Sequence, residues 1–126
     1  MTTNPKTLVE EINRTFEEAD IEAFLRHCTD DVRWNMLGSA PWIGKDAIRE
    51  AMGEMNPANA PKIYATRMIA EGDIVACEGT MEMTDTQGKF HQGAYCDVYR
   101  LQDGKVKELT SYYVETKEKA AAELTQ

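Results

Sequence analysis

The sequence lacks the features that mark nucleic-acid-binding and membrane proteins. Its 14 Lys and Arg residues are outnumbered by 22 Asp and Glu, which gives a net charge of −8. An acidic surface of this kind disfavours nucleic acid and anionic membranes as partners. No apolar run approaches the roughly 20 residues of a membrane-spanning helix. The polar N-terminus, residues 1–5, has no apolar signal-peptide core, so we expect a cytoplasmic protein.

Cysteine and histidine are also scarce. The cysteines are Cys28, Cys77 and Cys96, and no two have C-x-x-C spacing. This pattern suits a reducing cytoplasm and predicts neither a disulfide nor a zinc framework. The residue types that bind metals do not converge in the sequence, and no glycine-rich phosphate motif is present. We therefore expect no metal and no cofactor.

What is present is enough for one globular domain. With 126 residues, of which 42% are hydrophobic and 29% charged, the chain can build one core. We expect a single domain over 1–126, with its core at about 5–115 and a tail at 117–126. Apolar spacing predicts a helix over 5–18, a second from the cap Asp20 to about Cys28, and a third around Ile48 that ends near Pro57. A short strand is expected at 32–37.

The second half of the chain has the pattern of a sheet. Four strand-like runs are separated by turn signals at 71–73, 85–88 and 103–104. Helices first and an antiparallel meander second predict an α+β fold, with the helices on one face of a curved sheet. The runs are 62–70, 74–84, 89–101 and 105–115.

The middle hairpin can be assigned a register. A turn centred between Thr86 and Gln87 places Cys77 opposite Cys96, as packed thiols, and Ala76 opposite Asp97. One face then carries Glu78, Glu82, His91, Tyr95, Asp97 and Tyr99, with Arg67 opposite Glu78 on that face if the 72–73 turn is tight. The other carries Val75, Cys77, Met81, Met83, Phe90, Cys96 and Val98. A slip of one residue would reverse these assignments.

The last hairpin has two alternatives. A two-residue Asp103-Gly104 turn would align Tyr112 with the Asp97 face. A three-residue turn with Gly104 in a bulge would align Tyr113 instead.

Two segments carry a resemblance to a known family. Gly38-Ser39-x-Pro41-x-x-Gly44-x-x-Ala47-Ile48-Arg49-Glu50 is similar to the ketosteroid isomerase pattern, and Tyr95-Cys96-Asp97-Val98-Tyr99 with Gly104-Lys105-Val106 resembles a SnoaL-like ending. Over residues 5–115 the chain resembles the nuclear transport factor 2-like superfamily, within it the SnoaL-like polyketide cyclases and ketosteroid isomerases. The resemblance implies a cone-shaped curved antiparallel sheet wrapped around three N-terminal helices. It also implies a small-molecule pocket, but no single reaction.

The resemblance transfers residue roles only in part. Asn35 falls where ketosteroid isomerase has its aspartate base, and Ile12 where it has a tyrosine donor. Asp97 falls where it has the protonated aspartic acid of its oxyanion hole. An amide cannot abstract a proton and Ile has no donor, so we do not expect that isomerase mechanism. The SnoaL-like cyclases imply that Asp97 is an acid/base, and that Tyr113 rather than Tyr112 shares its face.

The candidate site centres on Asp97. Burial among apolar and aromatic residues would raise its pKa and suit it to proton transfer; otherwise it is a structural acid. Asn35 either orients a substrate carbonyl or serves as the hydrogen-bond partner of Asp97. Other residues could bind substrate or be structural: the aromatic residues as core, Arg67 and Glu78 as an ion pair, His91 as a surface partner of Glu82. These candidates are Trp34, Trp42, Tyr95, Tyr99, Tyr113, Arg67, Glu78 and His91.

Three functions remain open at this point. The first is a cofactor-independent cyclase, isomerase, dehydratase or epoxide hydrolase acting on a small apolar molecule through Asp97. The second is a binding or accessory domain without turnover. The third is a homodimer formed through the apolar sheet face, which the register above assigns to Cys77, Met81, Cys96 and Val98.

Overall fold

A computed structural model describes residues 4–116 of the chain, so the predicted tail at 117–126 lies outside them. Helices and strands follow the predicted order closely. The additional element is a two-residue strand at Trp42, where a loop was expected. The elements are α1 (Pro5–Glu17), α2 (Ile21–Arg26), β1 (Cys28–Met36), β2 (Trp42–Ile43), α3 (Lys45–Ala51), β3 (Lys62–Glu71), β4 (Ile74–Thr84), β5 (Phe90–Gln102) and β6 (Lys105–Thr116).

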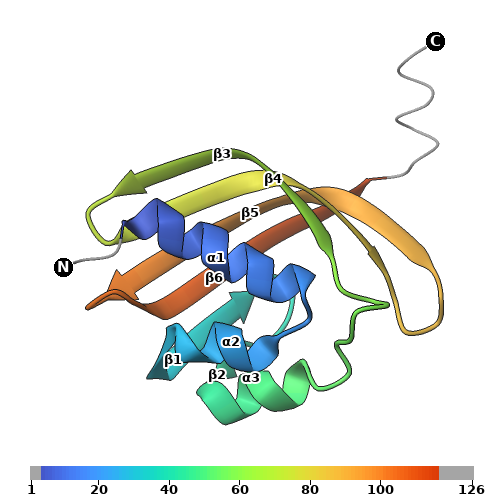
Figure 1. Cartoon of the computed structure of the whole chain (residues 1–126), viewed down its shortest axis with the longest axis horizontal. Helices are drawn as coiled ribbons and strands as arrows, with labels where there is room; N and C mark the ends of the chain where they lie inside the picture. Colours follow the sequence, from blue (N-terminus) through green and yellow to red (C-terminus); the bar gives the residue numbers. More distant parts are fainter. Residues whose placement is uncertain (1–3, 117–126) are drawn as a thin grey trace.

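The strands form one curved sheet that wraps around the helices (Figure 1). Their order is β2-β1-β6-β5-β4-β3. β1 and β6 run parallel, and every other neighbouring pair is antiparallel. Helix α1 packs against β3 and β4, whereas α2 and α3 pack against β1. The predicted α+β class, with a curved sheet around three helices, is confirmed.

Local sequence signals explain where the first two helices begin. The side chain of Asn4 accepts a 2.8 Å hydrogen bond from the backbone N–H of Lys6, and Pro5 occupies the first turn. Asp20 caps α2 in the same way by accepting from the N–H of Ala23 at 3.1 Å. Apolar residues of both helices then enter the core, which they share with the concave side of the sheet. These helical core residues are Leu8, Val9, Ile12, Phe16, Phe24 and Leu25.

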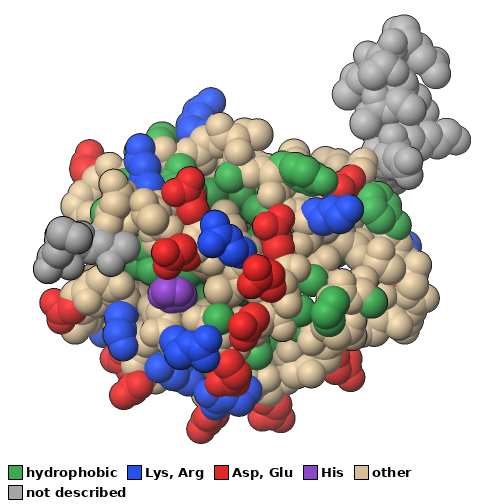
Figure 2. Space-filling model, in the orientation of Figure 1, with side chains coloured by type: hydrophobic (Ala, Val, Ile, Leu, Met, Phe, Trp, Pro, Cys, Tyr) green, Lys and Arg blue, Asp and Glu red, His purple; other side chains and the backbone are tan. Residues whose placement is uncertain are grey.

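Charged side chains cover the helical side of the molecule. Figure 2 shows Lys and Arg intermingled with Asp and Glu over the face where Figure 1 places the helices. Typical contacts there are between Arg49 and two acids, Glu22 and Asp46. Within residues 4–116 no helix is long and apolar enough to cross a membrane.

The predicted register of the middle hairpin is wrong by one residue. Cys77 pairs with Asp97, and Glu78 pairs with Cys96. The reason is the loop, which spans residues 85–89, an odd number, because Thr84 pairs with Phe90. The Asp85 carboxylate accepts hydrogen bonds from the backbone N–H groups of Gln87 and Lys89, both at 2.9 Å, and this shapes the odd-numbered loop.

The slip exchanges the two faces of β4. Cys77, together with Val75, Met81 and Met83, shares the concave face with Asp97, whereas Glu78 and Glu82 share the convex face with Cys96. Cys77 and Cys96 are therefore on opposite sides of the sheet. The apolar dimer face assigned to Cys77, Met81, Cys96 and Val98 does not exist as one surface.

The last hairpin combines parts of both predicted alternatives. Gln102 pairs with Lys105 across a two-residue turn, in which Asp103 and Gly104 have positive φ of 51° and 79°. The register then shifts between the pairs Leu101–Val106 and Arg100–Glu108. This bulge after the turn, rather than at Gly104, sets the alignment of the rest of β6.

As a result, Tyr113 pairs with Tyr95, and Ser111 pairs with Asp97. Tyr113 lies on the Asp97 face, as the family resemblance implies. Arg67 does lie opposite Glu78 as predicted, but on the convex face.

Candidate functional site

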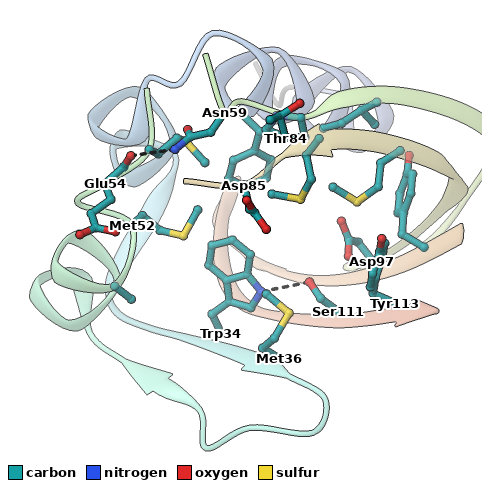
Figure 3. A pocket seen from close by; sticks show the side chains of 18 of the residues that line it. Trp34, Met36, Met52, Glu54, Asn59, Thr84, Asp85, Asp97, Ser111 and Tyr113 are labelled. Atoms are coloured by element: carbon teal, nitrogen blue, oxygen red, sulfur yellow. Dashed lines mark hydrogen bonds between the residues drawn. The ribbon is translucent and has the colours of Figure 1, made fainter. Parts of the chain in front are cut away.

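A cavity of about 430 Å³ lies between the helices and the concave face of the sheet. This volume falls within the range of small-molecule sites. Figure 3 shows side chains from both halves of the chain converging on it. The lining residues are Phe16, Trp34, Met36, Ala51, Met52, Glu54, Met55, Asn59, Pro61, Ile63, Met81, Met83, Thr84, Asp85, Thr86, Tyr95, Asp97, Ser111, Tyr112 and Tyr113.

The wall is mainly apolar and rich in methionine. Aromatic rings of Phe16, Trp34 and Tyr95 line the cavity, and Phe16 and Trp34 also contact each other with ring centroids 5.6 Å apart. Methionine is unbranched and polarizable, so it fits apolar ligands of varied shape. Five of the seven methionines line the cavity: Met36, Met52, Met55, Met81 and Met83.

Asp97 and Ser111 are two polar residues of this mainly apolar wall and lie on neighbouring strands (Figure 3). The indole N–H of Trp34 donates a 3.0 Å hydrogen bond to the Ser111 hydroxyl oxygen. Ser111 is paired with Asp97 across β5 and β6, and its hydroxyl favours the charged form of the Asp97 carboxyl. Trp34, Ser111 and Asp97 thus come from three neighbouring strands, β1, β6 and β5.

The environment of Asp97 suits it to exchange a proton. Burial raises the pKa of its carboxyl from the ordinary 3.8 to about 6, against the opposing effect of the Ser111 hydrogen bond. A group with a pKa near neutrality is populated in both its acidic and basic forms. The sequence predicted this raised pKa from the apolar neighbours of Asp97.

Two tyrosines near Asp97 differ in access to the cavity. Tyr95 lines it, and its hydroxyl lies 3.5 Å from the Cys77 sulfur. Burial raises the pKa of Tyr95 above its usual value. Tyr99 is fully buried and outside the lining, and its hydroxyl has no hydrogen-bond partner within residues 4–116. Of these two candidates, only Tyr95 is positioned to touch a ligand.

His91 lies beside the cavity rim with partners other than the predicted Glu82. Its Nε2 lies 2.9 Å from an Asp85 oxygen, and its Nδ1 lies 3.0 Å from a Glu115 oxygen. These two carboxylates raise the pKa of His91, with the Asp85 hydrogen bond as the larger cause. Glu82 instead accepts a hydrogen bond from the Tyr64 hydroxyl. His91 itself is not among the lining residues, although Asp85 is.

Asn35 lies on the opposite side of β1 from the cavity. Its neighbours Trp34 and Met36 both line the cavity, and successive side chains of a strand point to opposite faces. The Asn35 amide donates to Glu108 at 3.0 Å and to Thr110 at 3.1 Å. The predicted contact of Asn35 with Asp97 is therefore absent.

Three further candidates also lie outside the lining. Arg67 and Glu78 form a 3.2 Å ion pair with both side chains exposed, which is the structural alternative stated above. Trp42 is paired with Trp34 across β1 and β2 and packs edge-on against it, with ring centroids 5.3 Å apart, so it supports Trp34 from the side. Within the described residues, the predicted candidates that do line the cavity are Trp34, Tyr95, Asp97 and Tyr113.

Ser111 and the methionine side chains of the wall were not predicted from the sequence. Ser111 is two residues before Tyr113, so strand alternation would have placed it on the same face once Tyr113 was assigned there. Met81 and Met83 were assigned to the wrong face by the slipped register. No three His, Cys, Asp or Glu side chains gather as metal ligands in residues 4–116.

Comparison with known proteins agrees with this geometry. The family model described as SnoaL-like domain matches residues 9–109. No curated protein sequence matches the chain.

Several solved structures share the fold. An NTF2-like protein of unknown function from Burkholderia pseudomallei is 19% identical, with a TM-score of 0.77 over 90% of this chain and 92% of that one. SalBIII, an epoxide hydrolase/cyclase-like enzyme of pyran ring formation in salinomycin, is 24% identical, with a TM-score of 0.77 over 87% and 90%. A candidate ketosteroid isomerase from Kribbella flavida is 19% identical, with a TM-score of 0.74 over 90% and 80%. These likenesses show the fold.

Proposed function

The chain belongs to the SnoaL-like domain family, and from this we propose that its cavity binds a small apolar molecule and that Asp97 transfers a proton to or from it. The observation that carries the proposal is the Asp97 carboxyl within an apolar wall, with a pKa of about 6. Buried acids are rare unless they are paired or serve a reaction. Tyr113, on the same wall, would contact the ligand beside Asp97 (Figure 3).

The proposed step needs no cofactor. The Asp97 carboxylate removes a proton from a carbon next to a carbonyl, and the C–H electron pair moves into the enolate. The protonated acid then returns that proton to another atom of the same molecule. Double-bond isomerisation, aldol-type cyclisation and loss of a β-hydroxyl as water each can begin with this deprotonation, so the proposal specifies the step and leaves the product to the ligand. The Ser111 hydroxyl would stabilise the charged form of Asp97, and the apolar wall would exclude water from the reacting atoms.

The experiment uses exchange chemistry, because it needs no natural substrate. A bicyclic ketone such as 2-tetralone is incubated with the protein in D₂O, and loss of the proton signals next to the carbonyl is followed by NMR. We expect the wild type to accelerate exchange, and Asp97→Asn to remove about 10²–10⁴-fold of that acceleration. The matched control is Glu71→Gln, which removes an exposed carboxylate at the far end of β3. Equal exchange by wild type and Asp97→Asn would exclude Asp97 as the base.

A second candidate function is binding without turnover. It is favoured by Ile12, which the resemblance aligns with a tyrosine donor and which is fully buried in the core. Asn35, aligned with the isomerase base, likewise faces away from the cavity. In this case Asp97→Asn would change ligand affinity while no protein variant, wild type included, accelerates exchange.

A further inference from the structure

The charged side chains that line the cavity are all acidic. They are Glu54, Asp85 and Asp97, and no Lys, Arg or His is among the lining residues. Outside, by contrast, acidic and basic side chains are intermingled (Figure 2). We infer that the cavity selects ligands by charge, accepting an apolar molecule that bears a protonated amine and excluding the carboxylate counterpart. This inference rests on the binding half of the proposed function and deepens it.

Asp97 has no counter-ion among residues 4–116. Among the described residues no Lys, Arg or His forms an ion pair with it. Its stabilising partner is the Ser111 hydroxyl, which is neutral. With a pKa of about 6, the carboxyl is mostly ionised at pH 7.5. A partly buried carboxylate in an apolar wall is unfavourable without a cation, and a ligand ammonium would supply that cation.

Acidic side chains at the rim add to the negative charge of the cavity. Asp85 and Glu115 share one imidazole, that of His91, so this cluster keeps a net negative charge even when His91 is protonated. Glu54 is an exposed residue at the cavity rim and forms no ion pair within residues 4–116, and Figure 3 places it across the cavity from Asp97. An anionic ligand would therefore meet like charges at both ends of the cavity.

The uncharged wall favours the same ligand. Aromatic rings present a negative π face that attracts cations, and rings of Phe16, Trp34, Tyr95 and Tyr113 line the cavity. Methionine sulfur is polarizable and carries no positive charge to hold an anion. The apolar part of a ligand packs well against these groups, whatever its head group. The charge of the head group then determines which ligand binds more tightly.

The experiment compares three probes with one ring system. They are 2-naphthylmethylamine, 2-naphthalenemethanol and 2-naphthoate, which carry a cationic, a neutral and an anionic head group at pH 7.5. Isothermal titration calorimetry at low salt gives each affinity. We expect the amine to bind at least tenfold more tightly than the carboxylate, with the alcohol between them. Carboxylate binding as tight as that of the amine would overturn the inference.

Variants then identify the source of the ranking. Asp97→Asn should lower the ratio of amine to carboxylate affinity at least fivefold and leave the alcohol nearly unchanged. Glu54→Gln should lower the ratio by a smaller factor. Glu71→Gln, which removes the same charge outside the cavity, should keep the full ratio, and circular dichroism checks that each variant is folded. An equal loss of ratio in Glu71→Gln would overturn the inference, because net charge alone would then explain the ranking.

The two proposals fail in distinguishable ways. If none of the three probes binds, the binding half of the proposed function is wrong, and the inference with it. If all three bind with the same affinity, the cavity binds apolar molecules as proposed, and only the selection by charge is wrong.

Discussion

Trp34 and Ser111, 77 positions apart in the sequence, are joined by a 3.0 Å hydrogen bond from the indole N–H to the hydroxyl oxygen. The bond crosses the parallel pair of β1 and β6, on which both residues lie. Because the Ser111 oxygen accepts from Trp34, its own hydrogen is free to turn toward Asp97 on the paired strand, and the hydroxyl favours the charged form of that carboxyl. The orientation of one hydroxyl thus depends on a tryptophan that also forms the cavity wall.

We predict that Ser111→Ala raises the pKa of Asp97 above its value of about 6, because the mutation removes a donor that stabilises the carboxylate. It also leaves the buried Trp34 N–H without its acceptor, which costs about 1–3 kcal/mol of stability. Carbon-detected NMR titration of the Asp97 carboxyl measures the first effect, and denaturant unfolding the second. Ser39→Ala, in the exposed loop after β1, is the control. An unchanged or lower pKa in Ser111→Ala would contradict the stabilising effect of the Ser111 hydroxyl on the Asp97 carboxylate.

A second prediction concerns the stability of Asp97→Asn as pH changes. The folded-state pKa of about 6 is above the ordinary 3.8, so the folded state binds a proton more tightly than the unfolded state does. Wild type therefore loses stability relative to the variant as pH rises from about 4 to 7, by at most about 3 kcal/mol. The pKa values of the nearby Tyr95 and Tyr99 are raised, so these groups stay neutral in this window.

The measurement is urea unfolding of both proteins at pH 4, 5, 6, 7 and 8. Groups common to both proteins cancel in the difference of unfolding free energies. A difference that stays constant, or that shifts in favour of wild type at high pH, would show that burial does not raise the pKa of Asp97.

A third prediction concerns Gly79, which allows β3 to approach β4 closely. A Cβ atom at this position would overlap the Tyr64 carbonyl oxygen and would lie 2.9 Å from the Ala65 Cα. The neighbouring strand changes register between Ala65 and Arg67, so the contact is with backbone at a bulge. Backbone cannot move aside as a flexible side chain can. We expect Gly79→Ala to lose about 2–4 kcal/mol by denaturant unfolding.

Gly53→Ala is the matched control for this substitution. Its added Cβ would lie 3.3 Å from the Glu50 carbonyl oxygen, so we expect a change within about 1 kcal/mol. Equal losses in the two variants would mean that the close approach at Gly79 is relieved without strain.

A fourth prediction concerns His91, which links Asp85 in the 85–89 loop to Glu115 on β6. Both carboxylates raise the pKa of His91 above 6.5. The stabilisation is therefore fully present below pH 6.5 and is lost as pH rises through the folded-state pKa. We expect the stability gap between wild type and His91→Gln to be larger at pH 6 than at pH 9. Thermal unfolding at the two pH values measures it, and a gap that widens at pH 9 would refute the linkage.

The sequence predicted the elements better than it predicted their faces. Helix caps such as Asn4 and Asp20, and turn signals such as Gly72-Asp73, act locally and are visible in the sequence. The face of β4 depends on whether the 85–89 loop holds an odd or an even number of residues. That parity is set by hydrogen bonds from Gln87 and Lys89 to the Asp85 side chain, and composition does not reveal them.

The same limit applies to the candidate site. Asp97, Trp34, Tyr95 and Tyr113 were predicted and do line the cavity. Asn35 was assigned by family alignment, although the burial of Trp34 fixes the alternation of β1 the other way. The face of Ser111 depends on the bulge in β6, which changes the face of every later side chain. The signal for it was the placement of Tyr113 implied by the family resemblance.

The methionine wall bears on how this domain could diversify. Each methionine side chain has three rotatable bonds, so the shape of the cavity can change as these side chains change rotamer. A ligand of different shape can be bound by rotation of the methionine side chains alone, without movement of the strands. During evolution such a lining would let the protein bind new ligands before any residue is replaced. Later substitutions would then restrict the range of ligands that the cavity binds.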